Sequence, residues 1–220
     1  MNISNLPDFP QIEVCSPSQI EKRSMELICA ELGLRGIVLP AENGQTILRC
    51  IHTSADFDYA ENLVFSPGVV KKIKSVLVAE KPVIVTDTNM ALAGISSRAC
   101  ARLGIEKVCF MADEDVAIAA ESSGTTRAVC GVDKAADLFE NRPVIFAVGN
   151  APTALVRIRQ LHDAGLFFPR AVIGVPVGFV NVVQAKELII ESGMDYIVAR
   201  GQKGGSTIAA AIINSILYAL

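Results

Sequence analysis

Val144-Ile145-Phe146-Ala147-Val148-Gly149-Asn150-Ala151-Pro152 is the stretch that decides the fold of this chain. Its five consecutive apolar residues predict a strand buried on both faces, and the glycine and proline that follow predict a tight turn into a helix. The same order recurs at apolar runs over residues 83–87, 108–111, 171–175 and 196–199. Alternating strands and helices predict an α/β fold, a three-layer α/β/α arrangement with a mostly parallel sheet of about five strands, preceded by N-terminal helices.

The turns that follow these strands predict the position of a binding site. Right-handed crossovers place the carboxyl ends of parallel strands at one edge of the sheet, where ligands bind in folds of this class. Glycine-containing turns at 149–152, 176–179 and 201–206 lie there. Their backbone N–H groups favour an anion, although an alternative is that the glycines only end the strands tightly. Four cations near glycine-containing turns could add positive charge: Arg127, Arg157, Arg200 and Lys203.

His52 is the side chain best suited to proton transfer. It is one of two histidines in 220 residues, and imidazole is the side-chain type that titrates closest to neutral pH. A helix expected over residues 40–52 puts Arg49 and His52 on one face. The alternative is that His52 caps or packs a helix end. Asp56 and Asp58, just beyond it, either orient His52 or anchor a turn.

The rest of the chain is expected to complete a single domain over residues 1–220. Four further segments are expected: an irregular arm over residues 1–14, a helix from Ser16 to Gly33, a polar loop over 54–62, and a helix over 66–78. The start of the first helix is predicted by Ser16 as the cap and Gln19 as its capping-box partner. Ser24 lies within that helix.

Composition excludes several functional classes. The formal net charge is −3 with no run of Lys or Arg, so no nucleic-acid partner is expected. The six cysteines form no CxxC pair, so no zinc or iron–sulfur site is expected, and reduced thiols favour a reducing compartment. The apolar windows are broken by Gly and Pro and no signal peptide is recognised, so no membrane partner is expected. These features predict a cytoplasmic protein.

Motifs of other enzyme classes are missing from the sequence. The 201–206 turn lacks the GxxxxGK[ST] spacing of a phosphate loop, no GxGxxG follows the first strand, and there is no GxSxG. Asp113, Glu114 and Asp115 are adjacent at an expected helix start, where they suit the helix dipole better than a metal ion. His162 is interpreted as a dipole partner at a helix C-terminus. The residues alone therefore predict an anion-binding α/β protein with one acid–base histidine.

Several stretches together resemble the precorrin-8X (cobalt-precorrin-8) methylmutase family of cobalamin biosynthesis. They are Arg49-Cys50-Ile51-His52-Thr53 with Asp56-Phe57, Val64-Phe65-Ser66-Pro67, Ala147 to Leu155 (AVGNAPTAL), Val175 to Val180 (VPVGFV) and Lys203-Gly204-Gly205-Ser206. The similarity runs in order from about residue 12 to the C-terminus.

The resemblance implies an isomerase that needs no cofactor, any cobalt being carried by the substrate. It would move a methyl group from ring carbon 11 to ring carbon 12 of (cobalt-)precorrin-8, giving a hydrogenobyrinic or cobyrinic acid-type product, with His52 as proton donor and acceptor. The resemblance also implies a corrinoid substrate and a homodimer with active sites near the subunit interface. Substrate contacts in the family would fall on Ser24, Arg49, Ser96 and Arg127, with nearby turn residues Gly149, Asn150, Gly178, Lys203 and Gly204.

Two departures from the family pattern and two alternative functions accompany this resemblance. Ala55 stands where relatives commonly have glycine, and Gln202 stands where a basic residue is common. A non-catalytic tetrapyrrole-binding or carrier protein on the same fold is the main alternative function. A nucleotide- or phosphosugar-binding enzyme is a weaker one, because only the glycine turns favour it.

Overall fold

The computed structural model describes residue 13 and residues 15–220. Apart from Glu13, the arm expected over residues 1–14 therefore lies outside the described residues. The described chain forms two compact units, one that ends at Val38 and one that spans Leu39–Leu220. All strands of the described chain belong to the second unit.

The first unit contains helix α1 (Ile20–Leu34). The sequence predicts a start at Ser16, but the Gln19 N–H donates to the Ser16 carbonyl (2.8 Å) in a turn that precedes the helix. The Ser16 hydroxyl donates to Gln19 Oε1 (3.0 Å), so the two capping side chains bind each other instead of helical N–H groups. Ser24 lies on α1 and is partly exposed.

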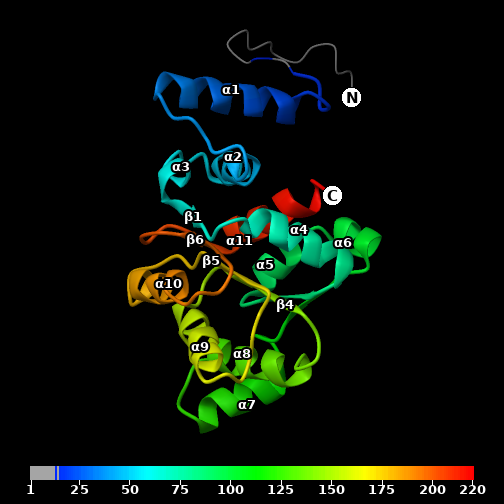
Figure 1. Cartoon of the computed structure of the whole chain (residues 1–220), viewed down its shortest axis with the longest axis vertical. Helices are drawn as coiled ribbons and strands as arrows, with labels where there is room; N and C mark the ends of the chain where they lie inside the picture. Colours follow the sequence, from blue (N-terminus) through cyan, green and yellow to red (C-terminus); the bar gives the residue numbers. More distant parts are fainter. Residues whose placement is uncertain (1–12, 14) are drawn as a thin grey trace, which may run out of the picture. The chain divides into compact units, whose positions relative to one another are not determined.

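The second unit is built on one six-stranded sheet with the order β1-β6-β5-β4-β2-β3 (Figure 1). The strands are β1 (Leu63–Phe65), β2 (Val83–Thr86), β3 (Glu106–Cys109), β4 (Val144–Val148), β5 (Ala171–Gly174) and β6 (Tyr196–Ala199). All neighbouring pairs are parallel except β1 and β6. The mostly parallel α/β sheet is thus confirmed, but the expected number of about five strands is one too low. The sequence missed β1 because an apolar run of three residues is too short to distinguish from a loop.

The second unit also contains helices that lie on this sheet or pack around those that do. They are α2 (Gly44–Ser54), α3 (Tyr59–Asn62), α4 (Val69–Ala79), α5 (Asn89–Gly94), α6 (Ser97–Leu103), α7 (Glu114–Ser122), α8 (Arg127–Leu138), α9 (Pro152–Asp163), α10 (Val182–Ile190) and α11 (Ser206–Leu217). Helices α8, α9 and α10 lie on one face, and α4, α5 and α11 lie on the other (Figure 1). Helix α2 packs along α11.

Strand β4 shows why two helical layers are needed. All five of its residues are buried. Val144, Phe146 and Val148 pack among residues of α8, α9 and α10. Ile145 and Ala147 point to the opposite face, which α11 covers. Nine of the twelve residues of α11 are buried, because this helix has the sheet on one side and α2 and α5 on others.

Several expected boundaries were wrong for local reasons. The Gly44 N–H donates to the Pro40 carbonyl (2.7 Å) in a turn, so α2 begins at Gly44 and not at residue 40 as expected. The loop expected over 54–62 contains the short helix α3. Gly68 adopts a left-handed conformation (φ 71°) and delays α4 to Val69. Strand β3 lies two residues earlier than expected, and α8 was not predicted.

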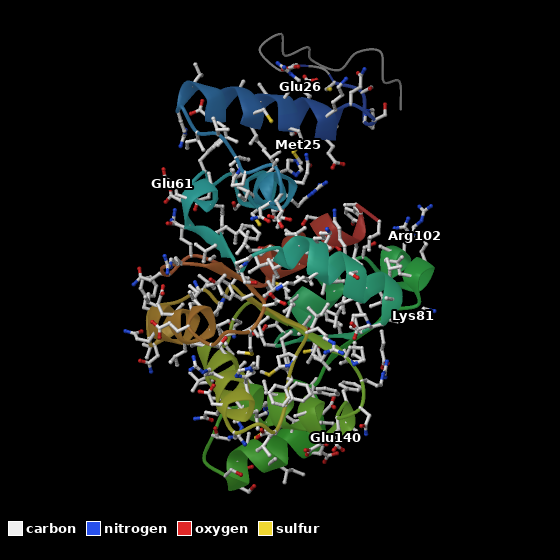
Figure 2. The ribbon with its side chains drawn as sticks, viewed as in Figure 1. Met25, Glu26, Glu61, Lys81, Arg102 and Glu140 are labelled. Atoms are coloured by element: carbon white, nitrogen blue, oxygen red, sulfur yellow. The ribbon has the colours of Figure 1, made fainter. Side chains whose placement is uncertain are left out.

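Side chains fix the C-terminal half of α11 to its neighbours. Arg102 on α6 (Figure 2) donates to the Leu217 carbonyl (3.2 Å). Asn214 accepts the Ser96 N–H (2.8 Å) and donates to the Gly94 carbonyl (2.8 Å). Helix α11, which makes these contacts, begins at the 201–206 glycine turn. It therefore extends from the expected site to α6.

Candidate active site

Three glycine turns meet at the carboxyl edge of the sheet, as the sequence predicts. The Gly178 N–H donates to the Gln202 carbonyl (3.1 Å), and the Gly205 N–H donates to the Val175 carbonyl (2.8 Å). A Cβ on Gly149 would lie 2.6 Å from Ser206 Cα, and a Cβ on Gly204 would collide with the Val175 carbonyl oxygen. Gly149 and Gly204 are therefore needed for the close packing of one turn on another.

Asp87 anchors the 149–151 turn. It follows β2, is only 7 % exposed, and accepts the backbone N–H groups of Gly149 (2.8 Å), Asn150 (2.8 Å) and Ala151 (2.6 Å). Burial raises the pKa of this carboxyl group, and the three backbone donors oppose that rise. The sequence predicts substrate contacts at Gly149 and Asn150, but the N–H groups of both residues already donate to Asp87. The exposed Asn150 side chain is the part of this turn that can still reach a ligand.

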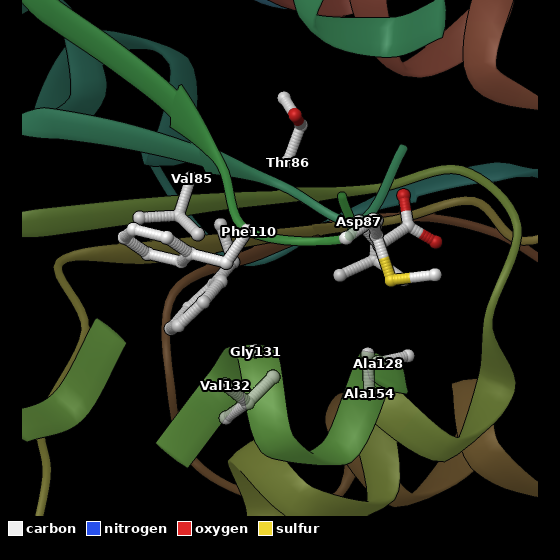
Figure 3. Close-up of a pocket in the computed structure, with 11 residues that line it drawn as sticks. Val85, Thr86, Asp87, Phe110, Ala128, Gly131, Val132 and Ala154 are labelled. Carbon is white, nitrogen blue, oxygen red and sulfur yellow. The ribbon is translucent and has the colours of Figure 1, made fainter. Parts of the chain in front are cut away.

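The cavity beside Asp87 is too small for a macrocycle. It holds about 20 Å³, which is room for about one water molecule (Figure 3). Apolar side chains of the sheet and of α8 and α9 line it, including Val85, Phe110, Ala128 and Ala154. A large ligand therefore cannot bind inside this cavity.

His52 lies near the C-terminal end of α2 and is partly buried. Among the described residues it has no hydrogen-bond or ion-pair partner, so both ring nitrogens can serve a ligand. Helix α2 packs against α11, with the Ser215 hydroxyl donating to Thr46 Oγ1 (3.0 Å). Arg49, one turn before His52, lies over the ring of Tyr218 with its Cζ 5.9 Å from the ring centroid.

The loop after His52 is fixed to the last glycine turn. Helix α2 ends at Ala55 in a left-handed conformation (φ 56°), and Asp56 Oδ1 accepts the Asp58 N–H (3.0 Å). Lys203 Nζ donates to Asp56 Oδ2 (2.7 Å) and to Asp58 Oδ2 (2.5 Å). The hydrogen bond from Lys203 lowers the pKa of the Asp56 carboxyl group. Of the two interpretations of these aspartates, loop anchoring is the one that the geometry supports.

The 201–205 turn retains backbone donors for a ligand. Within the described part of the chain, the N–H groups of Gln202, Lys203 and Gly204 have no hydrogen-bond acceptor. The Lys203 ammonium is bound by two carboxylates, but its N–H group and that of Gly204 remain open. This turn therefore presents three adjacent donors at the edge where the sequence predicts an anion.

The other expected contact residues fall in separate places. Arg127 begins α8, is exposed, and donates to the Met111 carbonyl (3.4 Å). The neighbouring Thr126 hydroxyl is 2.9 Å from Thr153 Oγ1, just after the 149–152 turn. The Ser96 hydroxyl caps α6 by accepting the Ala99 N–H (3.2 Å). Ser96 and Arg49 thus flank the C-terminal half of α11, whereas Arg127 lies beside the turns.

Sequence reasoning missed Lys186, a buried lysine on α10 behind the 201–205 turn. Its Nζ donates to the carbonyl groups of Gly201 (2.7 Å) and Lys203 (2.8 Å), and the residue is 0 % exposed. Burial lowers its pKa to about 8. A lysine on a helix usually indicates a solvated face, so no pattern signalled this role. Asp87 had a usable signal, because an acidic residue directly after a buried strand falls at the binding edge.

Over residues 13 and 15–220, no group of three or more His, Cys, Asp or Glu side chains could hold a metal ion. In the same part of the chain, no helix has the length and apolar character needed to cross a bilayer.

Comparisons with known proteins point to one family. A sequence profile of the precorrin-8X methylmutase family matches residues 19–219. The cobalt-precorrin-8 methylmutase of Salmonella typhimurium is 42% identical, over 79% of this chain and 80% of that protein. The precorrin-8X methylmutase of Pseudomonas aeruginosa is 33% identical, over 90% of this chain and 93% of that protein. A crystal structure of precorrin-8X methylmutase from Thermus thermophilus superimposes with a TM-score of 0.80 at 31% identity, covering 91% of this chain and 96% of the other.

Proposed function

Because this chain belongs to the precorrin-8X methylmutase family, we propose that it isomerises a precorrin-8-type corrinoid with His52 as the proton donor and acceptor. The environment of the His52 side chain is the observation that supports this role. Its imidazole has no partner among the described residues, and the loop after it is tied by Lys203 to the glycine turn that presents open N–H donors.

The proposed reaction is an intramolecular methyl shift. The bond between ring carbon 11 and its methyl group breaks as the bond from that methyl group to ring carbon 12 forms, so the mass and oxidation level of the substrate do not change. A proton from His52 to the conjugated ring would make the ring a better acceptor for the migrating bond, and the proton returns to His52 afterwards. The protein then has to orient the ring and exchange one proton, which suits a site with a single histidine.

Recognition of the substrate would rest on its acetate and propionate groups. The N–H groups of Gln202, Lys203 and Gly204 offer one site for a carboxylate, and Arg49 and Arg127 offer charge-assisted contacts. We also propose Ser96, Asn150 and Gly178 as substrate contacts and, from the family resemblance alone, Ser24. The ring itself would lie at the open edge, because the cavity beside Asp87 is too small.

We also propose that the enzyme needs no resident cofactor and works as a cytoplasmic homodimer. Relatives carry both the cobalt-precorrin-8 and the precorrin-8X names, so any cobalt would arrive inside the substrate. Six free cysteines, three of them buried, support a reducing compartment. Sedimentation of the purified chain tests the dimer.

The decisive experiment mixes the protein with cobalt-precorrin-8 and, in parallel, with the metal-free ring. We expect a change in the visible spectrum, an unchanged mass, and a methyl group that NMR places on carbon 12. His52→Ala should retain corrinoid binding and lose roughly a hundredfold or more in kcat, since general acid–base catalysis is worth that much.

His162→Ala is the matched control, because the other histidine lies at the end of α9 with its Nδ1 3.3 Å from Asp163 Oδ1. It should keep the activity of the unchanged protein. Binding without methyl migration would replace the isomerase by a carrier, and equal activity of the His52→Ala variant would remove His52 from the mechanism.

A further inference from the structure

Lys186 is the most deeply buried cation of the described chain, and the proposed reaction does not use it. It is 0 % exposed, and no carboxylate accepts a hydrogen bond from it. Burying an amine is costly unless it is well hydrogen-bonded. Its two hydrogen bonds go to the carbonyl groups on either side of Gln202. Among the described residues, the ammonium group therefore binds only the backbone of this turn.

That turn depends on such a donor. Gly201 is in a left-handed conformation (φ 76°), and the turn leaves the carbonyl groups of Gly201 and Lys203 directed at α10. Buried carbonyl groups without donors are destabilising. Lys186 therefore determines where the backbone of Lys203 lies.

The position of Lys203 in turn determines the loop after His52. Its ammonium binds Asp56 and Asp58, which lie immediately beyond the end of α2. An unbroken series of contacts thus runs from α10 through the turn to the helix end that carries His52.

We propose that Lys186 is a positioning residue, which fixes the 201–205 turn so that Lys203 can hold the Asp56–Asp58 loop and thereby the end of the His52 helix. The part of this proposal that concerns enzyme activity rests on the proposed methylmutase function. Lys186 touches neither the reacting atoms nor the imidazole, and it acts only through Lys203.

The test compares Lys186→Met with Lys107→Met. Lys107 on β3 also donates to two carbonyl groups, those of Leu92 (2.7 Å) and Ile95 (2.6 Å), but these belong to α5 and its end and not to the turn. We expect Lys186→Met to lower kcat roughly tenfold to a hundredfold, as a small displacement of reacting groups does, with KM within about twofold. Lys107→Met should leave both constants within about twofold.

A second readout does not require activity. The chain has two histidines, so its imidazole Cε1–Hε1 NMR spectrum contains two signals, which His52→Ala assigns. Lys186→Met should move the His52 signal and leave the His162 signal in place, and Lys107→Met should move neither. If the unchanged protein converts no corrinoid, the proposed function fails while this readout still decides the role of Lys186.

Lys203→Met keeps the inference testable if Lys186→Met does not fold, because Lys203 is exposed. It should move the His52 signal in the same way, and the double variant should lose no more kcat than the more damaged single variant. An unmoved His52 signal in Lys203→Met, or losses that simply add in the double variant, would overturn the proposal.

Discussion

Two turns at the same edge of the sheet are anchored by buried side chains of opposite charge. Asp87 accepts three N–H groups of the 149–151 turn, whereas Lys186 donates to two carbonyl groups of the 201–205 turn. The N–H donors of the 149–151 turn are therefore used by a buried side chain, whereas in the 201–205 turn it is the carbonyl acceptors that are used in this way. The backbone groups left for a ligand differ accordingly.

This difference changes what the glycine pattern means. Both turns contain glycine after a buried strand, and both appear equally suited to an anion from the sequence. Only the 201–205 turn keeps three adjacent N–H groups without a described acceptor. The partner that anchors a glycine turn, and not the glycine itself, decides whether the turn can bind an anion.

The largest effect on stability is expected from Asp87→Asn, which removes the carboxylate that anchors the 149–151 turn. The amide nitrogen would face N–H donors, and two or three buried bonds to a charged acceptor would be lost or weakened. We expect the free energy of unfolding in urea to fall by about 3 kcal/mol. Asp137→Asn, an exposed acidic change on α8, is the control and should cost less than about 0.5 kcal/mol. A loss below about 1 kcal/mol for Asp87→Asn would mean that the turn is held by its packing alone.

The free energy of unfolding measured against pH tests the buried Lys186 that anchors the 201–205 turn. Burial lowers the pKa of Lys186 from its ordinary 10.5 to about 8. Between these values the unfolded chain binds a proton that the native protein has released, so this group makes the free energy of unfolding rise with pH, by at most about 1.4 kcal/mol per pH unit. Subtracting the Lys186→Met curve from that of the unchanged protein should isolate this rise. Parallel curves from pH 8 to 10.5 would show that Lys186 titrates normally.

A smaller effect on stability is expected at Ala55, next to the Asp56–Asp58 loop that Lys203 binds. Ala55 ends α2 with φ 56°, a conformation that costs an L-residue roughly 1 kcal/mol and glycine little. Ala55→Gly should therefore raise the free energy of unfolding by about 0.5 kcal/mol after the extra entropy of the unfolded chain is subtracted. Gln45→Gly, an exposed helical position on α2, should lower it by up to about 1 kcal/mol. The same sign for both variants would contradict the conformational explanation.

The parts of the fold that were predicted share one property. Strands β2, β4, β5 and β6 are short apolar runs followed by turn residues, and burial on both faces is what makes such runs conspicuous. Strand β1 escaped prediction because it is short and its partner lies far away in the sequence, and helix α3 escaped prediction because it has only four residues. Leu63 pairs with Ala199, and no local pattern records that pairing.

The candidate site divides in the same way. The edge, the glycine turns and His52 follow from local patterns and from the family resemblance. Lys186 does not, and for Asp87 only the place at the binding edge does, because the roles of both residues depend on burial and on backbone groups of other turns. Ala55 lies between these cases, since its departure from glycine is visible in the sequence but its left-handed backbone is not.

The antiparallel pairing of β1 with β6 has a kinetic consequence. It joins Leu63–Phe65 to Tyr196–Ala199 and closes a longer stretch of chain than any other pairing in the sheet. Loop-closure entropy opposes such distant contacts, and a three-residue strand returns few hydrogen bonds for it. We therefore expect this edge to join the sheet last during folding. Its amides should also exchange with deuterium sooner than those of the central strand β4.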